Sequence, residues 1–383
     1  MVEYLDKAKR TNILFIITYL ELGGAQKQLL TIVKGLPSQD YSLTVCAGKG
    51  GYLTDKFLKL PNIKVKIIPY LVREINIFYD ILAFLKLFSF IRRNRFDIVH
   101  THSPKASFLG RWAAYFAGVK NIVYTVHGWP FHSFLDKFTY YFYLFLEKLT
   151  ARITKKIVVV SEIDLSIGIE KVVANKSKFT LIHYGIDERE KWESVFIRRE
   201  KLSSSDLIVN ISSLKMQKGI YDFITMAKII LKTKPNLKFM ILGDGYLRKD
   251  VERKIKVSNL NGKIILTGWV EDISDILEKC AVCVLTSLWE GLPLVVVECI
   301  FAGVPMVVTE TGGIKDIFNN NEQGIIVKPK DIEGLYKGVL EILDNYPYWQ
   351  RKVRDKRKIV DLSYWCKERM LEEIKSLYQN LPV

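Results

Sequence analysis

The sequence predicts two doubly wound α/β domains in tandem, each built on a parallel sheet. The first observation behind this prediction is that short β-rich runs alternate with helical patterns from end to end, as in consecutive βαβ units. The second is the length of 383 residues, which suits two domains with one apolar core each. The third is a charged segment without periodicity, Gly185 to Ser205, that separates two such series.

Each series contains six predicted strands with helical segments between them. Those of the first series are Asn12 to Thr18, Ser42 to Ala47, Lys64 to Pro69, Asp97 to Thr101, Asn121 to Thr125 and Lys156 to Ser161. Those of the second are Leu207 to Ile211, Lys238 to Leu242, Lys263 to Thr267, Ala281 to Thr286, Pro305 to Thr309 and Gly324 to Val327. A lone amphipathic helix, Tyr364 to Tyr378, is predicted last.

We therefore expect an N-terminal domain over residues 1–187, a linker over 188–205 and a C-terminal domain over 206–363. The last helix, within residues 364–383, is expected to cross back to the first domain. Ligands of such sheets bind beyond the carboxyl ends of the strands, and two such edges can face each other. A cleft between the domains is the expected place for chemistry.

Composition limits the class of protein. Hydrophobic residues make up 49% and charged residues 26%, which excludes a disordered chain and a multi-span membrane protein. The formal charge of +16 favours a polyanionic partner, such as phosphate groups, anionic lipid or nucleic acid. Five scattered cysteines do not form a disulfide framework and suit a reducing compartment. No transmembrane helix is predicted, because Glu298, Gly303 and Pro305 interrupt the longest apolar run.

Glycines mark the ends of several predicted strands. The pairs Gly23-Gly24 and Gly312-Gly313 each lie between a strand and a helix, and Gly243 follows a third strand. A glycine at a helix start lets a ligand approach free backbone N–H groups and the positive end of the helix dipole. A glycine turn without a ligand explains any single case equally well, but three together favour phosphate binding.

The most informative segment runs from Glu290 to Glu298. Pro293 suits the first turn of a helix, so Glu290 is expected in the preceding loop and Glu298 inside the helix, on an apolar face. A buried carboxylate needs a donor, which is either a ligand hydroxyl or a partner in an internal salt bridge. Lys218 follows another strand and precedes Gly219, which places its ammonium near the expected cleft unless it is one of the many solvated lysines.

All five histidines fall between residues 100 and 183. His100 and His102 stand two apart at a strand end, but there is no HExxH, Asp-x-Asp or cysteine cluster, so no metal site is predicted. His127, at the end of another strand and before Gly128, is the histidine best placed for a substrate role.

Basic and aromatic residues interleave from Phe84 to Arg95 and from Trp129 to Arg152. Some residues of these two segments must be buried in the hydrophobic core. The remainder predicts a surface that lies against anionic lipid headgroups with its rings in the interface.

Over nearly its whole length the chain resembles the retaining glycosyltransferases of family 4, which have the GT-B fold. Gly23 and Gly24 resemble the family's glycine loop near the donor phosphate, and His127 resembles the active-site histidine near the donor sugar. Lys218 matches the lysine that holds the donor pyrophosphate, which makes His127, Lys218 and Glu290 the expected catalytic residues. The remaining donor-binding residues that the resemblance and the glycine pattern imply are Ser213, Gly243, Gly268, Trp269, Val270, Gly291, Leu292, Pro293, Leu294, Glu298, Gly312 and Gly313.

Within this set the resemblance implies distinct roles. Glu290 and the amides after it would face the donor sugar, Glu298 would bind the ribose, and the segment Gly268 to Val270 would lie beside the base. Ser213 stands where the family usually has an arginine that shares the pyrophosphate charge. Lys218 and helix N-termini would then carry more of that charge.

The segment His100 to Ala106, with Trp129 to His132, is similar to members that build capsule or O-antigen on a polyprenyl-diphosphate lipid. The resemblance implies transfer of a hexose or N-acetylhexosamine from a UDP-sugar to a lipid-linked saccharide, with retention and without a metal cofactor. His102, Lys105, Arg111 and Trp129 would lie on the acceptor side. The enzyme would be cytoplasmic and peripheral on the inner face of the membrane, with no nucleic-acid partner.

Three alternatives remain open. A UDP-sugar 2-epimerase of the same fold would share the donor motifs but needs further acid and base residues. A nucleic-acid-binding protein would fit the charge, although no recognised module is present. A noncatalytic membrane-surface scaffold would bind lipid and ignore nucleotide sugars.

Overall fold

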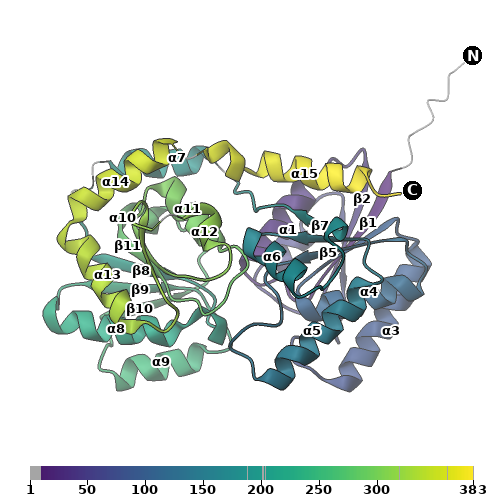
Figure 1. The fold of residues 1–383 in the computed structure, drawn as a ribbon, viewed down its shortest axis with the longest axis horizontal. Helices are drawn as coiled ribbons and strands as arrows, with labels where there is room; N and C mark the ends of the chain where they lie inside the picture. Colours follow the sequence, from purple (N-terminus) through teal and green to yellow (C-terminus); the bar gives the residue numbers. More distant parts are fainter. Residues whose placement is uncertain are drawn as a thin grey trace, which may run out of the picture. The chain divides into compact units, whose positions relative to one another are not determined.

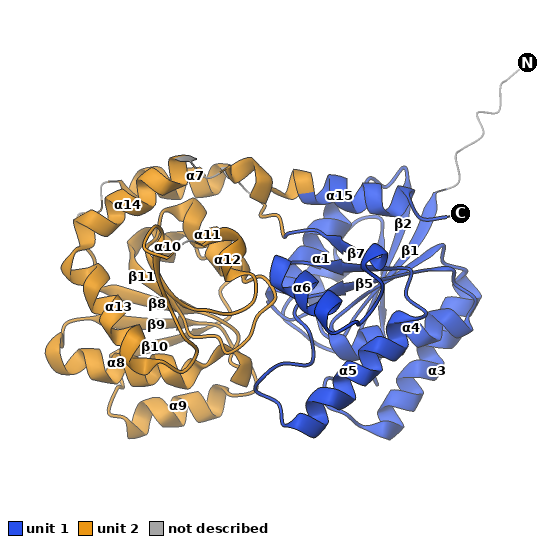
Figure 2. Cartoon of the chain, in the orientation of Figure 1, with its two compact units in different colours: residues 1–183, 370–383 blue, residues 184–369 orange. Residues whose placement is uncertain are grey.

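The computed structural model describes residues 10–187, 189–200, 202, 204–318, 320–359 and 361–382. The chain divides into two compact units, residues 1–183 with 370–383 and residues 184–369 (Figure 2). Each unit contains one fully parallel sheet with helices around it (Figure 1).

Unit 1 has a seven-stranded sheet in the order β3-β2-β1-β4-β5-β6-β7. Its strands are β1 (Thr11–Ile17), β2 (Tyr41–Ala47), β3 (Ile63–Ile67), β4 (Ile98–His102), β5 (Asn121–Val126), β6 (Lys156–Val159) and β7 (Phe179–Leu181). Every residue of β4 and β5 is buried, as expected for central strands covered on both faces. The strand order reverses between β1 and β4, so the carboxyl ends of these two strands flank the topological switch point.

The helices of unit 1 are α1 (Gly24–Gly35), α2 (Thr54–Leu58), α3 (Ile77–Asn94), α4 (Pro104–Phe116), α5 (Lys137–Ala151), α6 (Glu162–Glu170) and most of α15 (Lys367–Gln379). The side chains of Asn76, Asp136 and Ser161 cap the starts of α3, α5 and α6 by accepting a backbone N–H. Helix α4 contacts both α3 and α5, so these three lie side by side (Figure 1).

Unit 2 has a six-stranded sheet in the order β10-β9-β8-β11-β12-β13. Its strands are β8 (Leu207–Ile211), β9 (Lys238–Leu242), β10 (Ile264–Gly268), β11 (Cys280–Leu285), β12 (Met306–Thr309) and β13 (Gly324–Val327). Its helices are α7 (Arg189–Arg199), α8 (Ile220–Thr233), α9 (Arg248–Val257), α10 (Ser274–Lys279), α11 (Leu294–Ala302), α12 (Ile314–Ile317), α13 (Ile332–Asp344) and α14 (Tyr346–Ile359). The order here reverses between β8 and β11.

All twelve predicted strands are present, with ends that differ by at most two residues. The short strand β7 was not predicted, because three residues are too few to show a periodicity. No helix in the described ranges combines the length and the apolar composition that a membrane span requires.

The segment 188–205 was expected to be an irregular linker, but most of it is helical. Residues Arg189–Arg199 form helix α7, which packs against α10 and α11 in unit 2. Its last residue, Arg199, is 2% exposed and donates to the carbonyl oxygens of Leu277 at 2.5 Å, Cys280 at 2.7 Å and Gly303 at 3.3 Å. This arginine satisfies carbonyls near the ends of two helices, an interaction between distant segments that local periodicity cannot show.

Candidate active site

The predicted donor residues of unit 2 gather at the carboxyl edge of its sheet. Lys218 follows β8, and Glu290 follows β11, so the two flank the switch point of the strand order. Gly243 follows β9, Gly268 ends β10 and Gly312 follows β12. The sheet therefore brings together residues that are up to about a hundred positions apart in sequence, at the edge where parallel sheets bind ligands.

Lys218 and Glu290 are joined directly. The Lys218 ammonium donates to Oε1 of Glu290, and the two side chains are 20% and 9% exposed. Ser287 donates its hydroxyl to the same oxygen at 2.6 Å, and Gln217 donates its amide to the Trp289 carbonyl at 2.8 Å. Sequence reasoning missed Ser287 and Gln217, although a serine three residues before a loop carboxylate is a usable signal.

The loops around this pair are held by close backbone approaches that only glycine permits. Gly219 has φ +57°, and a Cβ there would lie 2.0 Å from the Thr286 carbonyl oxygen. Gly312 has φ +51°, and a Cβ there would lie 2.4 Å from the carbonyl oxygens of both Glu290 and Gly291. The Gly313 N–H also donates to the Gly291 carbonyl at 2.5 Å, which fixes one glycine turn against the Glu290 loop.

Helix α11 carries the second carboxylate. Pro293 is the N-cap residue and α11 begins at Leu294, so the prediction that Glu290 precedes the helix and Glu298 lies within it is confirmed. Glu298 is 7% exposed. The intervening Gly291 and Leu292 form the connection from Glu290 to the helix.

The remaining predicted donor residues lie on neighbouring loops. Ser213 follows β8 and accepts the Lys215 N–H at its carbonyl, at 2.8 Å. Gly243 and Gly268 pair across β9 and β10 through an isolated bridge, and Trp269 and Val270 continue from there. The structure thus places Ser213 on the same sheet edge as Lys218, with no charge of its own to contribute.

In unit 1 the predicted glycine loop follows β1, and Gly24 begins α1. Gly23 is the N-cap, without a side-chain hydrogen bond to the helix start. Next to it at the switch point, Ser103 receives Thr18 N–H at 3.1 Å and shares a 2.8 Å hydrogen bond with the Thr18 hydroxyl. Ser103 has φ +63°, a strained value for a residue with a Cβ, and this contact holds it there.

Three histidine rings lie in succession at the ends of β4 and β5. The ring centroids of His100 and His102 are 4.5 Å apart, and those of His102 and His127 are 5.1 Å apart. Nδ1 of His102 lies 2.9 Å from Nε2 of His127, while His100 contacts Tyr378 and Thr125. Burial lowers the pKa of His100 and of His127 to about 3 and that of His102 well below its ordinary value, so all three rings are neutral near pH 7.

Two residues expected on the acceptor side contact other residues of unit 1. Arg111 is fully buried, donates to Glu147 at 2.9 Å and stacks on the ring of Tyr124 at 4.2 Å. Trp129 is 5% exposed and donates its indole N–H to the Asp164 carbonyl at 2.8 Å. Each side chain is held by these contacts within unit 1, and its place on the acceptor side stays a prediction.

Lys105 lies at the start of α4, and its ammonium contacts Asp80 at 2.5 Å and the Glu74 carbonyl. His102 ends β4 and is 1% exposed. Within the described parts of the chain, no group of three or more His, Cys, Asp or Glu side chains could hold a metal ion.

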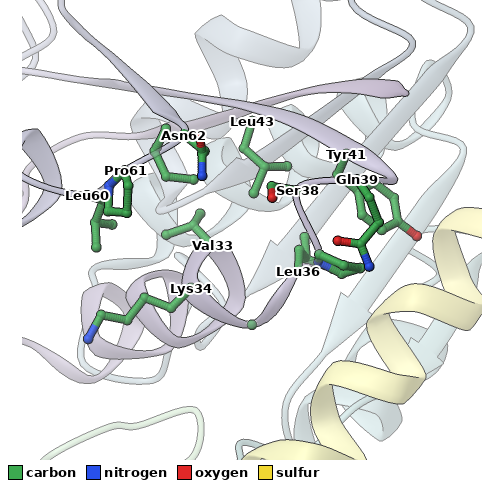
Figure 3. A pocket seen from close by; sticks show the side chains of 13 residues that line it. Val33, Lys34, Leu36, Ser38, Gln39, Tyr41, Leu43, Leu60, Pro61 and Asn62 are labelled. Atoms are coloured by element: carbon green, nitrogen blue, oxygen red, sulfur yellow. The ribbon is translucent and has the colours of Figure 1, made fainter. Parts of the chain in front are cut away.

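A pocket of about 360 Å³ lies elsewhere in unit 1, at the opposite edge of the sheet (Figure 3). The end of α1 and the segments that lead into β2 and β3 line it, and its polar side chains are Lys34, Ser38, Gln39, Tyr41 and Asn62. None of the site residues predicted within the described ranges lines this pocket.

The fold defines a class: a protein of two doubly wound α/β units, each with a parallel sheet whose carboxyl edge is the usual place for a ligand. The family description Glycosyltransferase Family 4 matches residues 22–190, and Glycosyl transferases group 1 matches residues 193–358. The chain belongs to these glycosyltransferases of family 4, and it has the GT-B fold.

Individual relatives support this assignment. The chain is 30% identical to an Escherichia coli UDP-Gal:α-D-GlcNAc-diphosphoundecaprenol α-1,3-galactosyltransferase, over 94% of this chain and 95% of the relative. It is 24% identical to the Staphylococcus aureus capsular polysaccharide biosynthesis glycosyltransferase CapM, over 80% and 83% of the two chains.

Solved structures show the same fold at low identity. Anabaena HepE in complex with UDP and glucose matches with a TM-score of 0.79 and 16% identity, over 97% of this chain and all of that one. WaaG, a glycosyltransferase involved in lipopolysaccharide biosynthesis, matches with a TM-score of 0.72 and 18% identity, over 94% and 99%.

Proposed function

We propose that this glycosyltransferase transfers a hexose or N-acetylhexosamine from a UDP-linked donor to a lipid-linked saccharide, in the assembly of a bacterial surface polysaccharide. The observation that carries the proposal is the Lys218–Glu290 pair, framed by the glycine turns at Gly219 and Gly312 on the carboxyl edge of the unit 2 sheet. The E. coli relative supports the choice of substrates, because it matches over almost its full length and its name specifies UDP-Gal and a diphosphoundecaprenol-linked acceptor.

Donor binding is assigned to residues 206–363 and acceptor binding to residues 1–187 with the last helix. Lys218 and backbone N–H groups at helix starts would stabilise the negative charge that develops on the departing diphosphate. Glu298 would bind the ribose diol, Trp269 and Val270 the base, and His127 and Glu290 the donor sugar. The leaving phosphate would take the acceptor proton, so the reaction needs no dedicated general base and retains the anomeric configuration.

The lipid-linked acceptor implies contact with the cytoplasmic face of a membrane, and an exposed surface of unit 1 supports this. On α3, Ile77, Phe78 and Ile81 are 77%, 67% and 54% exposed. On α5, Phe138 and Phe145 are 81% and 61% exposed. We call these residues, with the other exposed apolar side chains of the same region, the α3–α5 surface; the others are Ile75, Leu85, Tyr115, Phe116, Phe134, Tyr141 and Phe142.

Charge makes an anionic lipid surface the fitting partner. Exposed basic side chains flank the apolar ones, namely Lys86, Arg92 and Arg93 on α3, and Lys137 and Lys148 on α5. The sequence predicted this contact over Phe84 to Arg95 and Trp129 to Arg152, whereas most of the exposed apolar residues of α3 precede Phe84, with Leu85 the exception. Their spacing of three to four residues resembles that of a buried helix face, which is why the sequence did not reveal them.

Thermal shift and calorimetry with a panel of nucleotide sugars test the donor assignment. UDP-galactose, UDP-glucose and UDP-N-acetylhexosamines should raise the melting temperature, because only ligands that favour the native state do so. Transfer to a synthetic GlcNAc-diphospholipid, followed by mass spectrometry, then tests the acceptor. A protein that binds none of the UDP-sugars contradicts the proposal, and consumption of donor without acceptor would instead indicate an epimerase.

Liposome flotation tests the membrane contact. The wild type should float with anionic vesicles, less so at high salt, because screening weakens the basic contribution and leaves the apolar one. Phe138→Ser with Phe145→Ser should reduce flotation severalfold. Val257→Ser, at an apolar residue of unit 2 that is 69% exposed, serves as the control and should change nothing. Equal flotation with neutral and anionic lipid would contradict the charge argument.

A further inference from the structure

Arg248 lies beside the segment of unit 2 that is proposed to contact the base of the donor. It follows β9 and is the first residue of helix α9. Gly268, the residue that ends β10, has φ +77°, and a Cβ there would lie 3.4 Å from Nη1 of Arg248. The guanidinium is therefore next to the start of the segment Gly268 to Val270.

The loop that leads to Arg248 contacts the loops on both sides of it. Because β9 lies between β8 and β10 in the sheet, this loop lies between the turn that carries Lys218 and the end of β10. The N–H of Met216 donates to the Tyr246 hydroxyl at 3.1 Å, and Gly243 pairs with Gly268 in an isolated bridge. The loop thus connects the part of the edge proposed for the diphosphate with the part proposed for the base.

Two carboxylates hold the guanidinium of Arg248. Its Nη1 donates to Oδ2 of Asp244 at 3.0 Å, and its Nε donates to Oε1 of Glu252 at 2.8 Å. Asp244 is fixed in turn, because its Oδ1 accepts the N–H of Gly245 at 2.7 Å. With two of its nitrogens held, the planar guanidinium has a defined orientation.

The third nitrogen of the guanidinium remains available. An arginine has five N–H groups, two of them on Nη2. Among the residues that the structure describes, none accepts a hydrogen bond from Nη2 of Arg248, and the side chain is 36% exposed. The two carboxylates offset the positive charge, so the group attracts a diphosphate weakly but is still a strong hydrogen-bond donor to a neutral acceptor.

A pyrimidine base offers such an acceptor in its carbonyl oxygens. Glu298, which is proposed to bind the ribose, lies on α11 after β11, and β11 and β9 lie on opposite sides of β8. A base that extends from the ribose toward β10 would bring its outermost group, at ring position 4, to Arg248. Uracil has a carbonyl oxygen at this position, as thymine has, whereas cytosine has an amino group that donates.

We propose that Arg248 selects the base of the donor: its Nη2 donates to O4 of uracil, so the site prefers uridine nucleotides over cytidine nucleotides. The inference rests on the proposed function for the UDP-linked donor and for the position of the base beside Gly268. It adds a specificity-determining residue on α9 to the residues already assigned to donor binding.

Calorimetry with UDP, CDP and inorganic diphosphate tests the proposal. The wild type should bind UDP about tenfold more tightly than CDP, because the guanidinium meets an acceptor in one base and a donor in the other. Arg248→Ala should lose about tenfold in UDP affinity, while its affinities for CDP and diphosphate stay within about twofold of the wild type. Arg253→Ala is the matched control: it makes the same charge change on α9, at a side chain that is 72% exposed, and should alter none of the three affinities.

A second variant tests how the guanidinium is held. Asp244→Asn removes the carboxylate charge at Nη1 and keeps a side-chain oxygen for the Gly245 N–H. The preference for UDP over CDP should then fall severalfold, with the affinity for diphosphate unchanged. Because Arg248 is partly exposed, both variants should melt within a few degrees of the wild type, which shows that they are folded.

Three results would overturn the inference: a wild type that binds UDP and CDP equally well, an Arg248→Ala variant that keeps the preference for UDP, or equal losses for all three ligands. Equal losses would indicate that Arg248 acts on the diphosphate through its charge. In each of these cases the wild type still binds UDP, so the proposed function stands. A wild type that binds diphosphate but gains nothing from the uridine contradicts the proposed function and the inference together.

Discussion

The ammonium of Lys218 is bound to the carboxylate of Glu290, between loops that follow the two strands flanking the switch point of unit 2. In the free enzyme Glu290 is therefore the counterion of the lysine that is proposed to hold the donor diphosphate. Ser287 and Gln217 hold the Glu290 loop by contacts that do not involve the lysine. A diphosphate can thus replace the carboxylate at Lys218 while Glu290 keeps hydrogen bonds that orient it.

Replacement of this lysine should weaken donor and free UDP alike. Lys218→Ala removes a charge-assisted contact worth about 1.5–3 kcal/mol, which corresponds to a loss of roughly ten- to a hundredfold in affinity by calorimetry. Lys228→Ala, at an exposed position of α8, makes the same charge change away from the sheet edge and should cost little. Unchanged UDP affinity in Lys218→Ala would remove this residue from the site.

Substitution of the buried carboxylate of α11 should affect the nucleoside end of the donor. Glu298→Gln should reduce UDP affinity by about tenfold, because it removes the charge from a hydrogen bond to the ribose diol. The loss should be much smaller for an analogue that lacks both ribose hydroxyls. Equal losses for the two ligands would contradict the ribose assignment.

The glycine turn at Gly312 should be intolerant of any side chain. In Gly312→Ala the new Cβ would meet two carbonyl oxygens at 2.4 Å, so the Glu290 loop must shift. We expect UDP-sugar affinity to fall at least tenfold and the melting temperature to drop by several degrees. Gly262→Ala is a matched control, because Gly262 also has positive φ, +74°, but nothing lies within 4 Å of its Cβ. It should cost only the backbone strain of about 1–2 kcal/mol and leave UDP affinity intact.

The free energy of unfolding should decrease as the pH falls, because the buried histidines bind protons more readily in the unfolded chain than in the folded protein. The pKa of His100 is lowered from 6.5 to about 3, so below pH 6.5 the unfolded chain binds a proton that the folded chain refuses. The stabilising effect is complete above pH 6.5 and decreases by up to about 1.4 kcal/mol per pH unit down to pH 3. Urea unfolding at pH 7.5 and 5.5 should differ by at least about 1 kcal/mol, and His100→Asn should reduce that difference. An unchanged difference in the variant would contradict the prediction.

The fold could be predicted almost completely, because parallel strands buried on both faces produce apolar runs that local inspection detects. What the sequence could not show are contacts between distant segments. An arginine such as Arg111 is expected at the protein surface. It lies in the core because Glu147, 36 positions away in the sequence, neutralises its charge there. Helix α7 is charged along its length, and its place in unit 2 depends on Arg199 reaching the carbonyl oxygens of α10 and its neighbours.

The same limit applies to the candidate site. The glycines, Lys218 and the two glutamates could be identified because each follows a strand, and strand ends are recognisable. The ion pair between Lys218 and Glu290, the hydroxyl of Ser287 on the same oxygen and the pairing of His102 with His127 depend on side-chain directions across neighbouring strands. No local pattern encodes these directions.

Stereochemistry and metal dependence can be tested in one experiment. In the proposed mechanism Lys218 and the backbone N–H groups after Gly24 and Gly313 stabilise the leaving diphosphate, so catalysis should continue in excess EDTA. Glu290 is paired with Lys218 and is proposed to bind the donor, so the proposed mechanism assigns it no part as nucleophile or as general base. The acceptor should then attack from the face that the diphosphate leaves, and an α-linked UDP-hexose should yield an α-linked product. The anomeric proton coupling constant of the product, formed in EDTA, gives the result: a β linkage would contradict retention, and loss of activity that Mg²⁺ or Mn²⁺ restores would show that a metal takes part.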